Sequence, residues 1–234
     1  MCSNSSCIKY ADDITILHFI RNSDDDFCQV EWEHAIEWAE RNDLPLNTSK
    51  CSVMNIVTKS NLSVPPITLS DEQLLRSVSS VPMLGVIFSN NMKWNAHVDS
   101  IVSRASRRFY ILYNLAKSGC PPSLLHRVYV LCIRSILVYA CPVFCNIPVY
   151  LQKKLTGIER RASRILQAKP DVSISDVAST MCQRLFDSIQ RDARHPLREM
   201  FKTRGPTPRN QRTLCAPIAR TKRYGDSFIK FSHR

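Results

Sequence analysis

Hydrophobic and polar residues alternate around two adjacent aspartates near the start of the chain. Ile8 and Tyr10 precede Asp12 and Asp13, and residues 14–19 form a β-rich run after them. Alternation with β-branched and aromatic residues is typical of a strand, and aspartate suits a tight turn. The pattern predicts a β-hairpin over residues 7–19 that carries both carboxylates at its turn.

The next segment has helical periodicity. Residues 25–42 place an apolar face, which includes Cys28, Trp32 and Ala39, opposite a face of glutamates. Apolar residues at this spacing predict an amphipathic helix. A strand is predicted after the helix, over residues 52–57.

A second β-rich region follows a proline pair. The prolines at 65–66 mark a loop, and residues 67–69 are predicted to pair with residues 74–78. Residues 81–88 are apolar and β-rich, which predicts one further strand. Gly85 within this strand indicates a bulge or a close backbone approach.

From residue 95 onward the pattern is helical. An apolar stripe predicts a helix that ends before Gly119, and two further helices are predicted over residues 124–144 and 149–167. The chain after residue 196 is polar, basic and proline-bearing, so a loosely ordered tail is expected there. Strands followed by helices predict an α+β fold.

The segment 124–144 is about as long as a membrane span. Arg127 and Arg134 lie within it, and each would cost roughly 2.5–3.5 kcal/mol near a bilayer centre. A buried core helix is therefore favoured over a membrane helix. No apolar run follows Met1, so secretion is not indicated and a nuclear or cytoplasmic location is expected.

Charge divides the chain into two parts. Residues 1–80 carry 6 basic and 12 acidic side chains, whereas residues 81–234 carry 26 basic and 8 acidic ones. A strongly basic region can hold a polyanion such as a nucleic acid backbone. The alternative is a solvated cationic surface, and charge alone does not separate the two.

The ten cysteines form no Cys-x-x-Cys pair. Cys141 and Cys145 are four residues apart but have no matching second pair, so a zinc site is only weakly indicated. Reduced, mostly buried thiols are expected instead.

The adjacent carboxylates of Asp12 and Asp13 are the first candidates for chemistry. Like charges this close repel each other, and a divalent metal ion relieves the repulsion. Phosphoryl transfer with two metal ions needs carboxylates from at least two chain segments. An isolated aspartate pair is compatible with a metal site and also with an ordinary turn.

Several short motifs follow one another along the chain in a fixed order. They are Tyr10-Ala11-Asp12-Asp13, Leu44-Pro45-Leu46-Asn47, Lys50-Cys51-Ser52-Val53-Met54, Leu84-Gly85-Val86, Trp94 with His97, and Ile133-Arg134-Ser135-Ile136-Leu137. The ordered set resembles the C-terminal part of the reverse transcriptase of LINE-type (non-LTR) retrotransposons, of the jockey or RTE-like kind. The resemblance extends over nearly the whole chain.

The resemblance implies a division into four regions. Residues 1–90 would be a partial palm of antiparallel strands and one helix, with a primer-grip-like strand. Residues 91–120 would be a thumb-like helix, and residues 121–195 a helical C-terminal extension. Residues 196–234 would form the basic tail.

The resemblance also implies an RNA-directed DNA polymerase with RNA template and DNA primer as partners. Asp12 would be a Mg²⁺ ligand, Asp13 would support the second metal position, and Tyr10 would lie near the primer end. Lys50 resembles a lysine that acts on the leaving pyrophosphate, and the alternative is a surface lysine beside a strand.

The remaining candidates concern nucleic-acid binding. Leu84 and Gly85 would approach the primer through their backbone, or belong to an ordinary core strand. Trp94 and His97 are expected to pack the thumb rather than to bind a ligand. The basic helices contribute Arg104, Arg107, Arg108, Arg160, Arg161 and Arg164.

The chain departs from the family pattern in three ways. Met83 stands where an aromatic residue is common, and Phe144 where a tryptophan is common. The family's other catalytic aspartate lies well upstream of the Asp-Asp turn, so this chain is expected to be inactive alone. The alternative functions are a nucleic-acid-binding module and a non-functional remnant of a decayed element.

Overall fold

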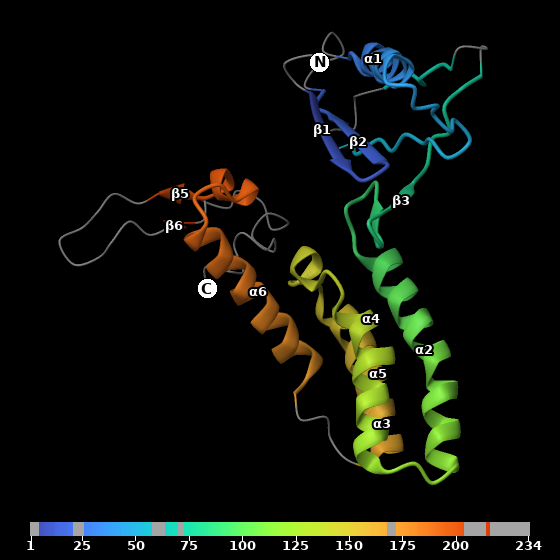
Figure 1. Ribbon diagram of the computed structural model, residues 1–234, viewed down its shortest axis with the longest axis vertical. Helices are drawn as coiled ribbons and strands as arrows, with labels where there is room; N and C mark the ends of the chain where they lie inside the picture. The colour runs from blue at the N-terminus through green and yellow to red at the C-terminus, as the bar shows by residue number, and fades with distance from the viewer. Residues whose placement is uncertain are drawn as a thin grey trace, which may run out of the picture. The chain divides into compact units, whose positions relative to one another are not determined.

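The computed structural model describes residues 5–20, 26–57, 64–69, 73–167, 172–203 and 214–215. The chain divides into two compact units, an N-terminal unit (Met1–Lys93) and a helical unit (Trp94–Arg234). Small antiparallel sheets and helices occur together (Figure 1), which confirms the predicted α+β class.

The first hairpin of the N-terminal unit has the predicted form. Strand β1 (Ser5–Tyr10) pairs antiparallel with β2 (Asp13–His18), and Tyr10 lies opposite Asp13 in the register. Ala11 and Asp12 therefore make a two-residue turn. The prediction that the aspartate pair lies at the hairpin turn is confirmed.

Helix α1 (Cys28–Arg41) begins three residues later than predicted, and residue 25 lies outside the described residues. The Lys9 ammonium of β1 lies 5.1 Å from the centre of the Trp38 ring, a cation–π contact that holds the hairpin against α1. Ala39 is buried on the predicted apolar face.

The region between α1 and β3 contains less regular structure than predicted. Residues 52–57 do not form a strand, because only Val53 makes an isolated bridge, with Ser77. Strand propensity without a longer partner does not produce a ladder. The predicted pairing of 67–69 with 74–78 is present only as the bridge from Thr68 to Leu74, and the intervening residues 70–72 are not described.

The single strand predicted over residues 81–88 is wrong. The segment forms a second hairpin from β3 (Ser80–Met83) and β4 (Val86–Ser89), joined by Leu84 and Gly85. Both turn residues have positive φ, 48° and 80°, as a type I′ turn requires. Gly85 adopts this conformation freely, so it serves a turn here and not the bulge that was predicted.

Helix α2 (Asn95–Lys117) opens the helical unit and confirms the predicted stripe. Val98, Ile101, Ala105 and Leu112 are almost completely buried in its core. Gly119 follows with φ 78°, a backbone conformation that ends the helix without steric cost.

The helix predicted over residues 124–144 is shorter and interrupted. It consists of α3 (Pro122–Val128), a π-helical stretch η2 (Tyr129–Arg134) and α4 (Ser135–Val138). Ala140 then adopts φ 52°, before the 3-10 turn η3 (Cys141–Phe144). Pro142 has no N–H to donate to the Val138 carbonyl, and its ring would clash with that carbonyl in a continuous helix, which explains the break after Val138.

None of the described helices combines the length and apolarity that a bilayer crossing requires.

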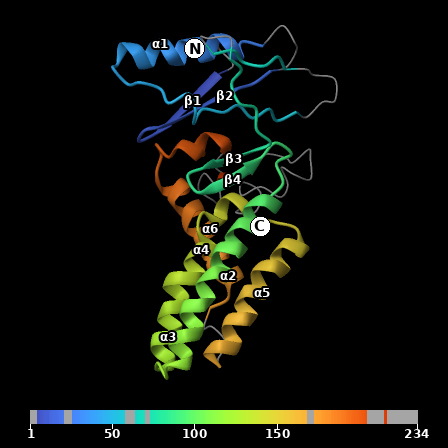
Figure 2. The same cartoon turned by 90° about the vertical axis from the view of Figure 1, so that its right-hand side faces the viewer.

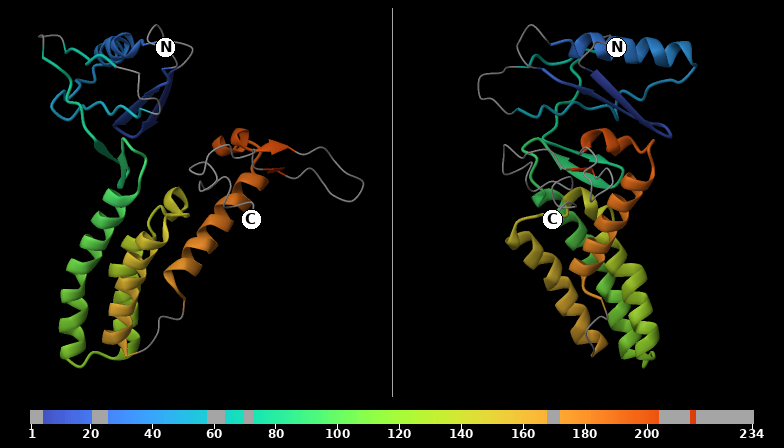
Figure 3. Two further views of the ribbon diagram at one scale, coloured as in Figure 1. Left: turned by 180° about the vertical axis from the view of Figure 1, so that it is seen from behind. Right: turned by 90° about the vertical axis from the view of Figure 1, so that its left-hand side faces the viewer.

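Helix α5 (Val149–Leu166) matches its predicted bounds closely, and Figures 2 and 3 show it beside α2 and α3. Leu151, Leu155, Ile158 and Ala162 face the common core. These four apolar residues recur every three or four positions and so lie on one side of the helix, which is why α5 packs as an amphipathic helix.

Helix α6 (Ile174–Arg191) was not separately predicted within the helical extension. The Ser173 hydroxyl caps it by accepting a hydrogen bond from the Asp176 N–H, at 3.1 Å. Ile174 joins the main core, and Phe186 packs against Phe201 further along.

The expected loose tail contains local structure at its start. A 3-10 turn, η4 (Pro196–Met200), leads into β5 (Lys202–Thr203), which pairs with β6 (Leu214–Cys215). Residues 204–213 and 216–234 lie outside the described residues, so the expectation of loose order stays a prediction there.

Candidate functional site

The Asp12 turn exposes both candidate metal ligands. Asp12 is the second turn residue and Asp13 the first residue of β2, and both side chains are exposed. Ala11 has φ 53°, a conformation that costs a non-glycine residue energy. The turn therefore presents two carboxylates to solvent from a strained backbone, and such strain is often found at functional sites.

The two carboxylates have the donor chemistry of a Mg²⁺ site but not its full ligand set. Carboxylate oxygens are the hard ligands that Mg²⁺ takes in proteins, and it usually retains several waters. Within the described residues, no group of three or more His, Cys, Asp or Glu side chains could hold a metal ion. Asp12 and Asp13 could therefore supply part of a coordination sphere.

The other predicted residues near this turn are accessible. Tyr10 is 63% exposed at the end of β1. Lys50 is exposed in a turn, where its N–H donates to the Asn47 carbonyl at 3.0 Å. In the described part of the chain, neither a hydrogen bond nor an ion pair joins Lys50 to the two aspartates.

The second hairpin presents Leu84 and Gly85 at its tip. Both residues are exposed, whereas Val86 just after them is buried. The exposed surface of Gly85 is backbone because glycine has no side chain, so the pair lies at an exposed tip rather than in the middle of a core strand. Leu84, like Ala11, is a non-glycine residue with positive φ.

The two basic helices carry an excess of cations that their own acids do not neutralise. Asp99 is the only acid of α2 and pairs with Lys154, while Glu159 is the only acid of α5 and accepts from the Ile174 N–H at 3.1 Å. The remaining cations on these helices are exposed: Arg104, Arg107, Arg108, Lys117, Lys153, Arg160, Arg161 and Arg164.

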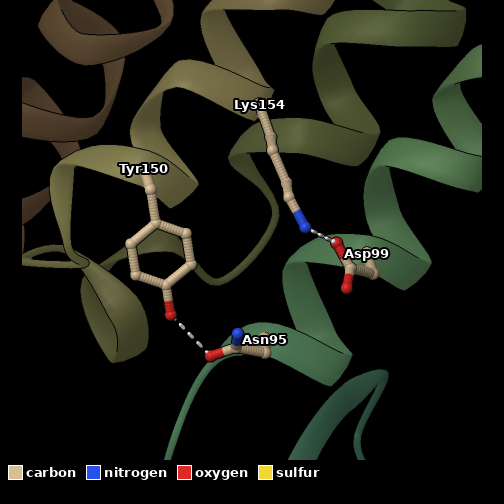
Figure 4. Close-up of polar contacts among 4 residues, drawn as sticks. All are labelled: Asn95, Asp99, Tyr150 and Lys154. Carbon is tan, nitrogen blue, oxygen red and sulfur yellow. Dashed lines mark hydrogen bonds and ion pairs between the residues drawn. The ribbon is translucent and has the colours of Figure 1, made fainter.

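Two polar contacts fix the register between α2 and α5 (Figure 4). The Tyr150 hydroxyl donates to Asn95 Oδ1 at 2.9 Å, and Lys154 Nζ lies 2.5 Å from Asp99 Oδ1. Each helix contributes residues four apart, which lie on one face.

A third contact extends this register. The Arg161 guanidinium lies 4.5 Å from the centre of the Phe109 ring. The partners of Asn95, Asp99 and Phe109 occur in increasing order along α5, so the two helices run parallel.

The six predicted arginines are all exposed, and their position on one surface stays a prediction. Arg161 contacts the side of α2 that faces α5. Arg104 lies seven residues from His97, hence on the same helical side as that histidine, and Arg108 follows one turn later.

Trp94 and His97 pack in the core, as expected. His97 is completely buried, its ring lies 4.8 Å from that of Phe144, and Trp94 contacts both rings. Burial lowers the pKa of His97, and the nearby Arg104 lowers the pKa further. Phe144, one of the departures from the family pattern, completes this aromatic cluster.

Three thiols gather where η3 contacts α6. Cys141 Sγ lies 3.6 Å from Met181 Sδ, and the interaction between Cys145 and Cys182 raises the pKa of Cys145 and lowers that of Cys182. Burial raises the pKa of Cys141 to about 12, so this thiol stays protonated. Within the described residues no group of three or more His, Cys, Asp or Glu side chains is placed to hold a metal ion, so the zinc site stays only weakly indicated.

Tyr110 and Tyr113 were not among the residues predicted from the sequence to bind a ligand. Both are exposed on α2, beside the buried residues Phe109 and Leu112. Their signal was present in the sequence, because two aromatic residues fall outside the apolar stripe of the helix.

Comparisons with protein-family models, curated proteins and solved structures found no match to the chain.

Proposed function

We propose that the chain is the C-terminal part of a non-LTR retrotransposon reverse transcriptase, an RNA-directed DNA polymerase. In this proposal the N-terminal unit is part of the palm, and the helical unit contains the thumb and the C-terminal extension. The observation that carries the proposal is the conformation of two motifs. Asp12 and Gly85 each follow a non-glycine residue with positive φ at a hairpin tip.

The first tip supplies the chemistry in this proposal. Asp12 and Asp13 would hold Mg²⁺, which neutralises charge on the attacking 3′-oxygen and the leaving pyrophosphate. The ladder pair Tyr10–Asp13 closes the turn and places the two adjacent carboxylates at its tip. Covering the hairpin with the rest of a palm would hold the turn in this form when charge develops.

The second tip supplies positioning. Gly85 is exposed at the tip and has no side chain to keep a ligand away from its backbone. A primer strand could therefore approach this backbone closely. Tyr10, exposed beside the carboxylates, would contact the primer end.

The proposal is tested in a fusion that adds the fingers and the first half of the palm to this chain. The chain is joined behind the fingers and first palm half of a non-LTR reverse transcriptase, and primer extension on an RNA template is measured with Mg²⁺. Extension is expected, and Asp12→Ala should reduce it by at least about 100-fold because a preorganised charge is lost.

Glu40→Ala is the matched control, since Glu40 is an exposed carboxylate on α1. This variant should retain full extension. The chain without the added region should extend no primer, with Mg²⁺ or Mn²⁺. Extension that persists in Asp12→Ala would contradict the proposed role of the turn.

A second candidate function is a nucleic-acid-binding module formed by α2 and α5. The excess of exposed cations over acids on these helices favours it. Phosphate contacts would dominate and sequence preference would be slight. Six such contacts would give a slope of log K against log salt of about −5.

The module is tested by combining Arg160→Gln, Arg161→Gln and Arg164→Gln. The magnitude of the salt slope should fall by about 3, since each cation contributes nearly one unit. Arg41→Gln is the control, because Arg41 pairs with Glu37 in the N-terminal unit. Affinity that is independent of salt would exclude this function.

A further inference from the structure

Two tyrosines on the outer side of α2 are unusually exposed for aromatic residues of a packed helix. Tyr110 is 74% exposed and Tyr113 is 60% exposed. Residues three apart on a helix are neighbours, so the two rings share one patch of surface. In the described part of the chain, neither phenol makes a hydrogen bond. The rings are therefore available to an external partner.

Arginines border this pair on both sides. Arg107 precedes Tyr110 by three residues, which places the two side chains next to each other on α2. Tyr113 lies one helical turn after Phe109. The Arg161 guanidinium lies 4.5 Å from the centre of the Phe109 ring. Because α2 and α5 are parallel, Arg164, three residues after Arg161, is at about the same level along the two helices as Tyr113, four residues after Phe109.

These five residues, Arg107, Tyr110, Tyr113, Arg161 and Arg164, form the tyrosine–arginine face. The two acids of α2 and α5, Asp99 and Glu159, are outnumbered by the cations of these helices, and Asp99 already pairs with Lys154. The face thus combines accessible aromatic rings with uncompensated positive charge.

We infer that the tyrosine–arginine face binds single-stranded RNA, with bases stacked on Tyr110 and Tyr113 and phosphates held by the arginines. Alternation of stacking rings and cations is the arrangement by which proteins hold unpaired strands. This inference rests on the proposed function for RNA as the partner, and adds to that function a site for unpaired template.

Double-stranded RNA cannot make the stacking contacts that the tyrosine–arginine face offers. Its bases are stacked on one another, so their planes are not available to a tyrosine ring, whereas bases of a single strand can be splayed out. Ser103 and Asn114, both exposed, lie seven residues before and four after Tyr110. Their polar groups can hydrogen-bond a 2′-hydroxyl, which favours RNA over DNA.

The test measures fluorescence anisotropy of labelled oligouridylate with the full chain. The Tyr110→Leu/Tyr113→Leu double variant should raise Kd by on the order of 5-fold or more for each ring removed. Tyr110→Phe/Tyr113→Phe should bind like the wild type, because the rings remain. Tyr139→Leu, which removes another exposed tyrosine of the helical unit, should also leave Kd unchanged.

Three probes complete the test. An abasic strand with the same phosphates should bind wild type and double variant equally, and duplex RNA should show no tyrosine dependence. A deoxyuridine strand should bind more weakly than oligouridylate. Wild-type affinity for oligouridylate in the double variant would overturn the inference, and equal affinity for the deoxy strand would overturn the assignment to RNA. A wild-type chain that binds no probe would count against the proposed function as well.

Discussion

The two units of this chain bury their apolar residues to very different degrees. In the described part of the N-terminal unit, β1 pairs only with β2, and Ile8 and Phe19 are 50% and 64% exposed. In the helical unit, Phe109, Tyr129 and Leu151 are almost completely buried in one core. The same chain thus contains an open sheet and a closed bundle.

This difference follows from how strands and helices satisfy their backbones. A helix makes its hydrogen bonds internally and needs only neighbours for one face. A strand makes its hydrogen bonds with neighbouring strands, and an isolated two-stranded hairpin is marginally stable in water. The N-terminal unit therefore has the features of a surface that further strands could cover, whereas the helical unit supplies its own core.

The largest expected effect tests the closed core. Leu151→Ala should lower the free energy of unfolding of the helical unit by about 2–5 kcal/mol, because it leaves a cavity at a completely buried position. Urea denaturation followed by circular dichroism measures this change. Val149→Ala, two residues earlier and largely exposed, should change stability by less than about 0.5 kcal/mol. Equal losses would contradict the packing described.

The second prediction compares backbone protection in the two units. Amides of β1 and β2 should exchange with solvent at least about 100-fold faster than the central amides of α2, because small sheets open locally at low cost. Hydrogen-exchange mass spectrometry measures both segments in one experiment. Protection of β1 equal to that of α2 would show that the hairpin is stabilised by contacts beyond α1.

The third prediction concerns pH. The pKa of His97 is lowered in the folded chain, so the unfolded chain binds the extra proton first as pH falls below about 6.5. Stability is therefore fully present above that pH and should fall below it, by up to about 1.4 kcal/mol per pH unit.

Urea denaturation between pH 7.5 and 5 measures this slope. His97→Phe should flatten it, while His34→Leu, a change of an exposed histidine on α1, should not. An unchanged slope in His97→Phe would assign the pH dependence to another group.

The smallest expected effect concerns the contacts that fix the register of α2 and α5. Asp99→Asn should cost about 0.2–1 kcal/mol, because its partner Lys154 is also exposed. A loss above about 2 kcal/mol in chemical denaturation would show that the pair, rather than the core, holds the helices together.

The sequence by itself determined features that depend on local pattern. The Asp12 turn was predictable because turn-forming residues stand between two β-rich runs. The bounds of α2 and α5 were predictable because each apolar stripe extends over several helical turns. Candidate cations were also visible, since charge needs no structure to be counted.

Only the tertiary structure decided features that depend on which surfaces meet. Residues 81–88 form a hairpin rather than a strand because Leu84 and Gly85 both adopt positive φ, which an apolar pattern does not specify. The exposure of Tyr110 and the position of Arg161 depend on the register between α2 and α5. A sequence pattern defines the faces of each element, but packing between elements decides which faces are covered and which remain open to a partner.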